Sequence, residues 1–195
     1  MSPARGELLD AAVPDGFRYR DGFLTVDDEA LLAEEIARVE FSTFEMRGLV
    51  ARRRVAFFGR AYDVGGPVTP SMPPFLRRLR DHVAAWAGLD PSAFAMALIN
   101  EYPPGAPIGW HRDAPQYDIV AGLSLLSSCR MRFRPYVRPG GQNSTGRPRR
   151  IATHAITIDP RSAYVMAGES RNAYEHHIPA VTRLRYSITF RTLRS

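Results

Sequence analysis

Polar and apolar residues alternate strictly in residues 185–191, close to the end of the chain. One face of this segment carries an arginine at each end with a serine and a threonine between them, and the other face carries Tyr186, Ile188 and Phe190. Residues 94–102 alternate as well, and one face passes from apolar to polar side chains: Met96, Leu98, Asn100 and Tyr102. Because successive side chains of a strand point to opposite faces, both segments predict β-strands, and the second predicts a face that leads from core to ligand.

Two helices are expected ahead of most of the strands. Residues 25–41 place Leu32, Ile36 and Val39 on one face behind an acidic capping segment, and residues 74–89 show a similar apolar stripe that ends near a glycine. Further strands are predicted at 120–133, 154–158, 162–166 and 184–192, with two short strands around Gly48 within 44–62 and a loop at 63–74. The fold class expected is α+β, mainly β, on a double-sheet barrel with one open mouth.

Composition narrows the class of protein. The 195 residues suit one domain, which we expect from residue 18 to residue 195 after a flexible segment 1–17. A single cysteine, Cys129, excludes an intramolecular disulfide, and no signal peptide or transmembrane segment is apparent, so we expect a soluble cytoplasmic protein with no membrane partner. No coiled coil calls for a partner chain, which favours a monomer.

The net charge of +6 comes from arginine alone, because the chain contains no lysine. Seven arginines and no acidic residue lie within 130–150. Guanidinium groups bind phosphate oxygens in pairs, so this segment suits contacts with nucleic acid, although a solvated loop explains the same composition.

A candidate metal site begins with His111 and Asp113, which lie two residues apart just after the predicted strand 94–102. Side chains at this spacing on an extended chain point the same way, so both can bind one ion. His176 is the candidate third ligand; its neighbour His177 would face the opposite way, and periodicity alone does not choose between them. Two imidazoles and one carboxylate with open positions suit Fe(II) better than Zn(II).

The arginines of segment 185–191 suit a dianionic co-substrate. Arg185 and Arg191 would be about 20 Å apart on a fully extended strand, so each can address one end of such a ligand. Asn100 and Tyr102 can add neutral hydrogen bonds to the same ligand.

At this point the chain resembles the AlkB family of Fe(II)- and 2-oxoglutarate-dependent dioxygenases. The resemblance rests on five motifs in the family's order: Asn100-x-Tyr102, Pro104-Gly105, His111-x-Asp113, His176-x-Ile178 and Arg185-x5-Arg191. It favours His176 over His177 and implies Fe(II) as cofactor with 2-oxoglutarate and O2 as co-substrates. It also implies a double-stranded β-helix, or jelly-roll, core over about 94–195, a substrate lid over about 44–72, and two flanking N-terminal helices. The implied co-substrate residues are Asn100, Tyr102, Arg185, Ser187, Thr189 and Arg191.

The resemblance further implies oxidative dealkylation of N-alkylated bases such as 1-methyladenine or 3-methylcytosine in DNA or RNA. Enzymes that act on a base extrude it into a pocket, which needs stacking and phosphate contacts. The aromatic and arginine side chains expected to meet the substrate are Arg54, Phe57, Phe58, Tyr62, Trp110, Arg112 and Arg132. Pro115 departs from the family's pattern, because repair enzymes often carry an acidic residue there that touches the base.

Two other functions fit parts of the sequence. An oxygenase with the same chemistry acting on a protein or small molecule would turn over without any response to oligonucleotides. A non-catalytic basic β domain that binds nucleic acid would take up no iron and would be indifferent to His111→Ala.

Overall fold

The computed structural model describes residues 13–46, 49–60, 69–137 and 153–194. Two antiparallel sheets form its centre. The larger sheet contains β1 (Phe17–Arg20), β2 (Ser42–Met46), β3 (Leu49–Gly59), β4 (Phe94–Tyr102), β6 (Tyr117–Leu125), β9 (Ser162–Met166) and β11 (Arg185–Leu193). The smaller sheet contains β5 (Ile108–His111), β7 (Cys129–Pro135), β8 (His154–Ile158) and β10 (Tyr174–Ile178).

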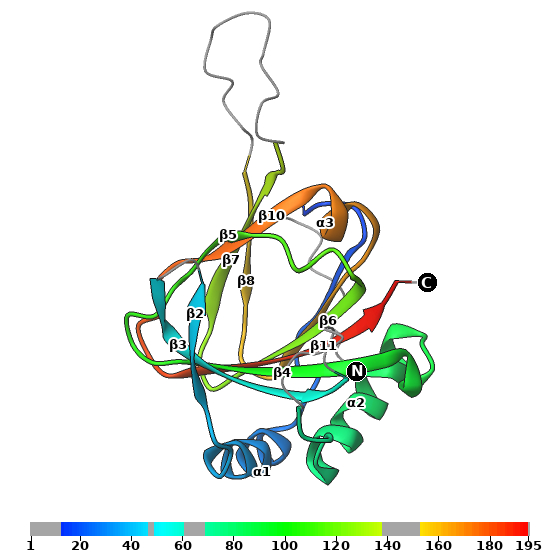
Figure 1. Ribbon diagram of the computed structural model, residues 1–195, viewed down its shortest axis with the longest axis vertical. Coiled ribbons are helices and arrows are strands. Elements are labelled where there is room, and N and C mark those ends of the chain that lie inside the picture. Colours follow the sequence, from blue (N-terminus) through cyan, green and yellow to red (C-terminus); the bar gives the residue numbers. More distant parts are fainter. Residues whose placement is uncertain (1–12, 47–48, 61–68, 138–152, 195) are drawn as a thin grey trace, which may run out of the picture.

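The seven strands of the larger sheet run in the order β1-β9-β6-β11-β4-β3-β2, and the four of the smaller sheet in the order β5-β10-β7-β8. Along the chain the strands move repeatedly from one sheet to the other, as expected for a jelly roll. Helices α1 (Val26–Ala37) and α2 (Pro74–Ala87) cover the face of the larger sheet that points away from the smaller one (Figure 1). The predicted fold class and both flanking helices are therefore confirmed.

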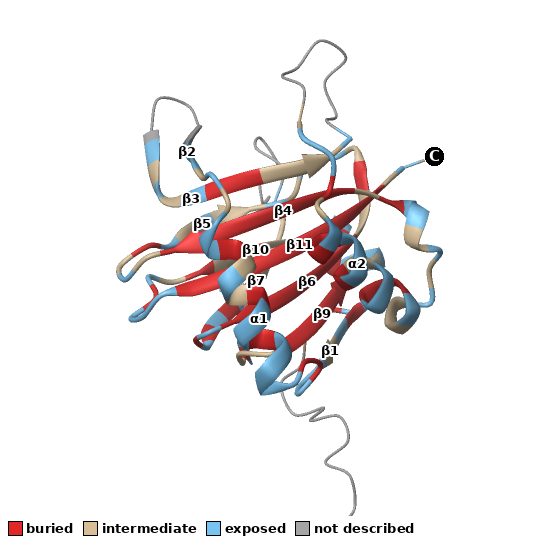
Figure 2. Cartoon of the chain, turned by 90° about the horizontal axis from the view of Figure 1, so that it is seen from below, coloured by how far each residue is buried: buried red, intermediate tan, exposed pale blue. Residues whose placement is uncertain are grey.

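The alternation along β11 separates two environments. Tyr186, Ile188 and Phe190 join the core between the larger sheet and the helices, where Ile36 and Leu76 are fully buried. Figure 2 views this helix-covered side, with buried residues running the length of the central strands. The other face of β11 looks toward the smaller sheet, and a second core with Phe133 and Ile158 at its centre fills part of that space.

The helix boundaries follow local chemistry. Helix α1 begins after Thr25, whose hydroxyl accepts a hydrogen bond from the Asp28 amide at 3.1 Å while the Asp28 carboxylate accepts one from the Thr25 amide at 3.1 Å. It ends at Ala37, short of the predicted residue 41, because Val39 and Phe41 leave the helix and pack against the core of the larger sheet. Helix α2 begins at Pro74 and ends before Gly88, whose φ of +75° closes the helix as predicted.

Several short elements were not predicted. They include β1, β5, the 3-10 turn Pro91–Ala93 and helix α3 (Gly168–Asn172). The predicted flexible segment 1–17 is too long at its end, because Phe17 pairs with Met166 and its ring meets Phe133 edge-on at 5.2 Å. Residues 1–12 of that segment lie outside the described residues. Among the described residues, no helix is long and apolar enough to cross a membrane.

Candidate active site

A cavity of about 450 Å³ opens between the two sheets. The larger sheet supplies one wall through alternate residues of its two central strands. These residues are Met96, Leu98, Asn100 and Tyr102 of β4 and Ser187, Thr189 and Arg191 of β11. The predicted mixed face of 94–102 and polar face of 185–191 therefore meet on this wall, since the two strands pair in antiparallel register with Ser187 opposite Asn100.

The smaller sheet brings the two candidate histidine ligands together. His111 at the end of β5 lies opposite His176 of β10, and their ring centroids are 4.2 Å apart. His111 donates from Nδ1 to the Gly109 carbonyl at 2.9 Å, which leaves Nε2 available as a ligand. His177 points elsewhere and stacks on Trp110 at 5.0 Å, so the pairing of the strands selects His176.

Asp113 follows β5 directly and also lines the cavity. Its Oδ1 accepts a hydrogen bond from a terminal nitrogen of Arg191 at 3.0 Å, with both side chains about one-tenth exposed. This ion pair links the end of β11 in one sheet to the segment that follows β5 in the other.

The electrostatics of this site favour neutral imidazoles and an ionised carboxylate. Burial, with a contribution from His111, lowers the pKa of His176 to about 3, and burial also lowers the pKa of His111. Burial acts to raise the pKa of Asp113, but the positive charge of Arg191 and its hydrogen bond, with further contributions from the two histidines nearby, hold it well below its ordinary value. Neutral imidazole and carboxylate are the protonation states in which these groups bind a metal.

These residue types fit Fe(II), although they do not form a closed cage. Within the described ranges, no three His, Cys, Asp or Glu side chains converge as a bound ion would require. The Asp113 carboxylate is turned toward Arg191, which accounts for this. Two imidazoles and one carboxylate from neighbouring positions nevertheless match the ligand set of non-haem iron oxygenases.

Two buried arginines test whether the site also fits 2-oxoglutarate, because each has nitrogen donors that form no hydrogen bond with the described residues. Arg185 is fully buried, and its Nε donates to the Ser124 hydroxyl at 2.9 Å. Among the described residues, neither of its terminal nitrogens has a hydrogen-bond partner. Its guanidinium lies 5.2 Å from the centre of the Tyr102 ring. Arg191 likewise has two buried nitrogens without a partner. Buried cations with open donors are costly unless a ligand satisfies them, so the pair fits a dianion such as 2-oxoglutarate.

Comparison with known proteins gives the family. The model of the 2OG-Fe(II) oxygenase superfamily matches residues 31–191. The chain belongs to this superfamily. Fe(II), 2-oxoglutarate and O2 are the metal, co-substrate and oxidant of its members, as predicted.

The AlkB resemblance is confirmed by named relatives. An "Alkylated DNA repair protein ALKBH8 homolog" from Arabidopsis thaliana is 27% identical over 184 residues, which cover 86% of this chain and 51% of the relative. The "Uncharacterized protein L905" of Acanthamoeba polyphaga mimivirus is 26% identical over 167 residues, covering 85% of this chain and 73% of that protein. The chain thus spans about half the length of the first relative.

Solved structures share the fold at low identity. The structure of OsALKBH1 superposes with a TM-score of 0.63 at 15% identity, covering 92% of this chain and 99% of that one. A Pseudomonas putida prolyl-4-hydroxylase gives a TM-score of 0.59 at 17% identity, covering 92% of this chain and 94% of its own. The dioxygenase jelly roll is therefore the architecture of this chain, and the prediction of a 2-oxoglutarate/Fe(II)-dependent dioxygenase is confirmed.

Some of the predicted substrate residues of this dioxygenase border the cavity. Phe57 of β3 lines it together with Trp110 and Arg112. The Trp110 ring stacks on His177, and the guanidinium of Arg134 lies 4.5 Å from the centre of the same ring. Arg112 lies over the Tyr136 ring at 3.5 Å.

Other predicted substrate residues lie elsewhere, which corrects their assignment. Arg54 and Phe58 occupy the opposite face of β3, because side chains alternate along a strand: Arg54 forms an ion pair with Glu101, and Phe58 packs toward the helix-covered core. Arg132 is exposed on β7 between the inward-facing Met131 and Phe133, so it does not line the cavity. Tyr62 lies outside the described residues.

Arg53 and Tyr164 are among the cavity residues that were not predicted from the sequence. Arg53 lines the cavity and donates from Nε to the Asn100 side-chain oxygen at 3.2 Å; its place in a run of three arginines concealed which one faces inward. Tyr164 of β9 lines the cavity opposite Gly122, where an added Cβ would lie 2.2 Å from the Tyr164 ring. A glycine within the strand pattern of 120–133 was the available signal for such a close approach.

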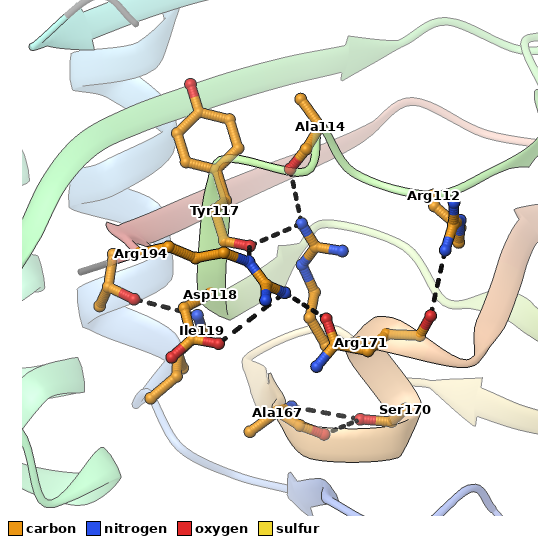
Figure 3. A network of polar contacts seen from close by, with 11 residues as sticks. Arg112, Ala114, Tyr117, Asp118, Ile119, Ala167, Ser170, Arg171 and Arg194 are labelled. Atoms are coloured by element: carbon orange, nitrogen blue, oxygen red, sulfur yellow. Dashed lines mark hydrogen bonds and ion pairs between the residues drawn. The ribbon is translucent and has the colours of Figure 1, made fainter.

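A buried arginine from α3 holds the segment that follows Asp113 (Figure 3). One terminal nitrogen of Arg171 donates to the carbonyls of Ala114 at 2.6 Å and Tyr117 at 2.8 Å. Arg112 reaches the same helix by donating to the Asn172 carbonyl at 3.1 Å. The metal-ligand segment is therefore fixed from both sides of Asp113.

Proposed function

We propose that this chain is an AlkB-like dioxygenase that oxidatively dealkylates N-alkylated bases in DNA or RNA. The observation that carries the proposal is that His111, Asp113 and His176 line one cavity. Arg191 lines the same cavity, Arg185 lies beside the wall residue Tyr102, and both arginines have buried nitrogens without a partner among the described residues. The printed name of the Arabidopsis relative, an alkylated DNA repair protein homologue, supports a nucleic-acid substrate. The aromatic wall at Phe57 and Tyr117 supports a planar group as the part that enters.

In this proposal different residues bind the iron and the two ends of 2-oxoglutarate. His111, Asp113 and His176 hold the iron. Arg191 contacts Asp113, so it binds the end of 2-oxoglutarate nearest the metal, while Arg185, enclosed beside Tyr102 and Ser124, binds the far carboxylate. Bound Fe(II) supplies the redox chemistry by which O2 and 2-oxoglutarate give succinate, CO2 and one oxygen atom for the substrate.

The protein's own part is to orient the N-alkyl carbon and to exclude water from the site. When that carbon is hydroxylated, its bond to the ring nitrogen breaks, the nitrogen takes up a proton, and the alkyl group leaves as an aldehyde. Asn100 and Tyr102 bring hydrogen-bonding groups to the same wall, and Ser187 and Thr189 continue it toward Arg191.

The test is single-turnover dealkylation. Protein loaded anaerobically with Fe(II) and 2-oxoglutarate is mixed with air and methylated DNA and RNA oligonucleotides, and succinate and lost methyl groups are measured by mass spectrometry. We expect both products from the unaltered protein and neither from His176→Ala.

The matched control is His177→Ala, which removes an imidazole one residue away whose ring stacks on Trp110 rather than on His111. It should retain turnover. Succinate without methyl loss would redirect the search to protein or small-molecule substrates, and iron binding without either product would refute the catalytic proposal.

A further inference from the structure

The described part of the cavity wall carries more positive than negative side chains. Among the described residues that line it, Arg53, Arg112 and Arg191 are basic, whereas Asp113 is the single acidic residue. Glu101 does not offset this, because its carboxylate pairs with Arg54 on the opposite face of the sheet. Arg185 adds a further buried cation behind Tyr102.

Loading the site does not remove this excess. Fe(II) and the 2-oxoglutarate dianion carry equal and opposite formal charges, so together they leave the balance of the wall unchanged. Asp113 is already adjacent to Arg191, and Arg185 and Arg191 are the arginines assigned to the co-substrate. Counted over the described lining residues, the charge that faces the substrate is therefore positive.

Arg53 is the cation placed to meet the substrate. It lies on β3 on the same face as Val55 and Phe57, and all three line the cavity. Its Nε donates a hydrogen bond to the side chain of Asn100, a residue assigned to the co-substrate. The Arg53 guanidinium therefore lies next to the proposed position of 2-oxoglutarate, on the side of Val55 and Phe57.

This arrangement discriminates between bases by charge. A base alkylated at a ring nitrogen so that it becomes cationic, such as 1-methyladenine or 3-methylcytosine, would be repelled by the wall. An uncharged base with a ring carbonyl, such as 3-methyluracil or 1-methylguanine, presents an acceptor to a guanidinium and carries no opposing charge.

We propose that the cavity selects uncharged, carbonyl-bearing alkylated bases over cationic ones, and that Arg53 is the residue that determines this specificity. The inference rests on the proposed dealkylation of bases and replaces cationic lesions as its preferred substrates.

The test uses a matched pair of lesions. 3-Methylcytosine and 3-methyluracil carry the methyl group on the same ring nitrogen and differ in charge and in the group at position 4. Each is placed in the same single-stranded oligonucleotide, and affinity is measured anaerobically by fluorescence anisotropy for protein loaded with Mn(II) and 2-oxoglutarate. We expect 3-methyluracil to bind about tenfold more tightly, the size of one favourable charge-assisted contact.

Variants at position 53 assign the preference to its residue. Arg53→Gln should bring the two affinities to within about twofold, and Arg53→Glu should reverse their order, by the sign of the charge removed or introduced. Arg52→Gln is the matched control, because it removes the same charge at the neighbouring position. The Arg52 side chain is exposed and donates to the Gly105 carbonyl at 3.3 Å. This variant should keep the preference of the unaltered protein.

Several outcomes would overturn the inference. One is tighter or equal binding of 3-methylcytosine by the unaltered protein, and another is binding of both lesions no better than the unmodified strand. A loss of affinity in Arg53→Gln that is equal for both lesions would assign Arg53 to the phosphate backbone instead. Affinity is measured without turnover, so the two proposals can fail separately. If the oligonucleotides bind selectively but lose no methyl group in air, the proposed function fails while the inferred specificity stands.

Discussion

Arg185 combines complete burial with two terminal nitrogens that no group in the described part of the chain satisfies. Such a group gives little to the stability of the protein without its ligand, since an unpaired buried charge is costly. Its value lies in the co-substrate that completes its hydrogen bonds. Function and stability therefore make opposite demands on this position.

Arg185→Met should separate these demands. We expect the free energy of unfolding of the ligand-free protein to change by no more than about 1 kcal/mol, because a lost bond to Ser124 is offset by removal of a buried cation. Stabilisation by 2-oxoglutarate, about 2.7 kcal/mol for the unaltered protein at a hundred times its dissociation constant, should disappear.

Urea unfolding of Mn(II)-loaded protein with and without 2-oxoglutarate measures both effects. Arg183→Met, a change of the same kind at an exposed neighbouring arginine, should retain the full ligand effect. Full stabilisation of Arg185→Met by 2-oxoglutarate would show that another residue holds the far carboxylate.

Gly122 makes a different demand, for space. An added Cβ would lie 2.2–2.6 Å from three atoms of the buried Tyr164 side chain, so Gly122→Ala must displace a side chain that lines the cavity. We expect a loss of about 1–3 kcal/mol in the free energy of unfolding, as is typical of overpacked cores. Gly109→Ala, where a Cβ meets nothing within 4 Å, should change it by less than about 0.5 kcal/mol in the same urea titration. Equal effects of the two substitutions would contradict this account.

At the scale of elements, β3 shows where sequence reasoning reached its limit. In β4 and β11 the alternation itself marks the inward face, and Asn100, Tyr102 and Arg191 do line the cavity, whereas Arg185 lies beside it against Tyr102. Residues 52–54 are all arginine and residues 57 and 58 are both phenylalanine, so the period of two is hidden. A shift of one residue exchanges the faces of a strand, and only the pairing of β3 with β4 fixes which residues face inward.

Helix α3 and β5 were missed for another reason. Each is no longer than five residues and is stabilised by distant partners rather than by local propensity. Residues 103–107 before β5 are rich in proline and glycine and predict a loop, yet β5 pairs with β10 and so brings His111 opposite His176. The residue types of the candidate iron site could thus be proposed from the sequence, while the approach of His111 to His176 depends on pairing between strands far apart along the chain.

Helix α3 acts on the iron site through Arg171. Arg171→Met removes the hydrogen bonds to the carbonyls of Ala114 and Tyr117, so the segment after Asp113 should loosen. We expect the affinity for Mn(II), measured by calorimetry, to fall about tenfold, as for other groups that orient metal ligands. Arg77→Met, which removes an arginine bond to the Met72 carbonyl of 2.8 Å far from the cavity, is the control. An unchanged affinity in Arg171→Met would limit Arg171 to a structural role.

At the scale of the molecule, the candidate ligands divide between the two sheets. His111 and His176 belong to the smaller sheet, with Asp113 just beyond it, whereas Arg185 and Arg191 belong to the larger. A metal alone therefore engages one side of the cavity. A co-substrate that binds both the metal and the arginines connects the sheets, so binding energy from one sheet should stabilise the other.

Hydrogen exchange can measure this connection. Mn(II) alone should slow amide exchange in β5 and β10. Adding 2-oxoglutarate should slow the same amides further, up to about a hundredfold at a hundred times its dissociation constant, although its arginines lie in the larger sheet. In Arg185→Met, Mn(II) should still slow exchange, but 2-oxoglutarate should no longer slow it further, because the far carboxylate then has no cation to bind it. If 2-oxoglutarate slowed exchange in β11 but left β10 unchanged, the two sheets would bind their ligands independently.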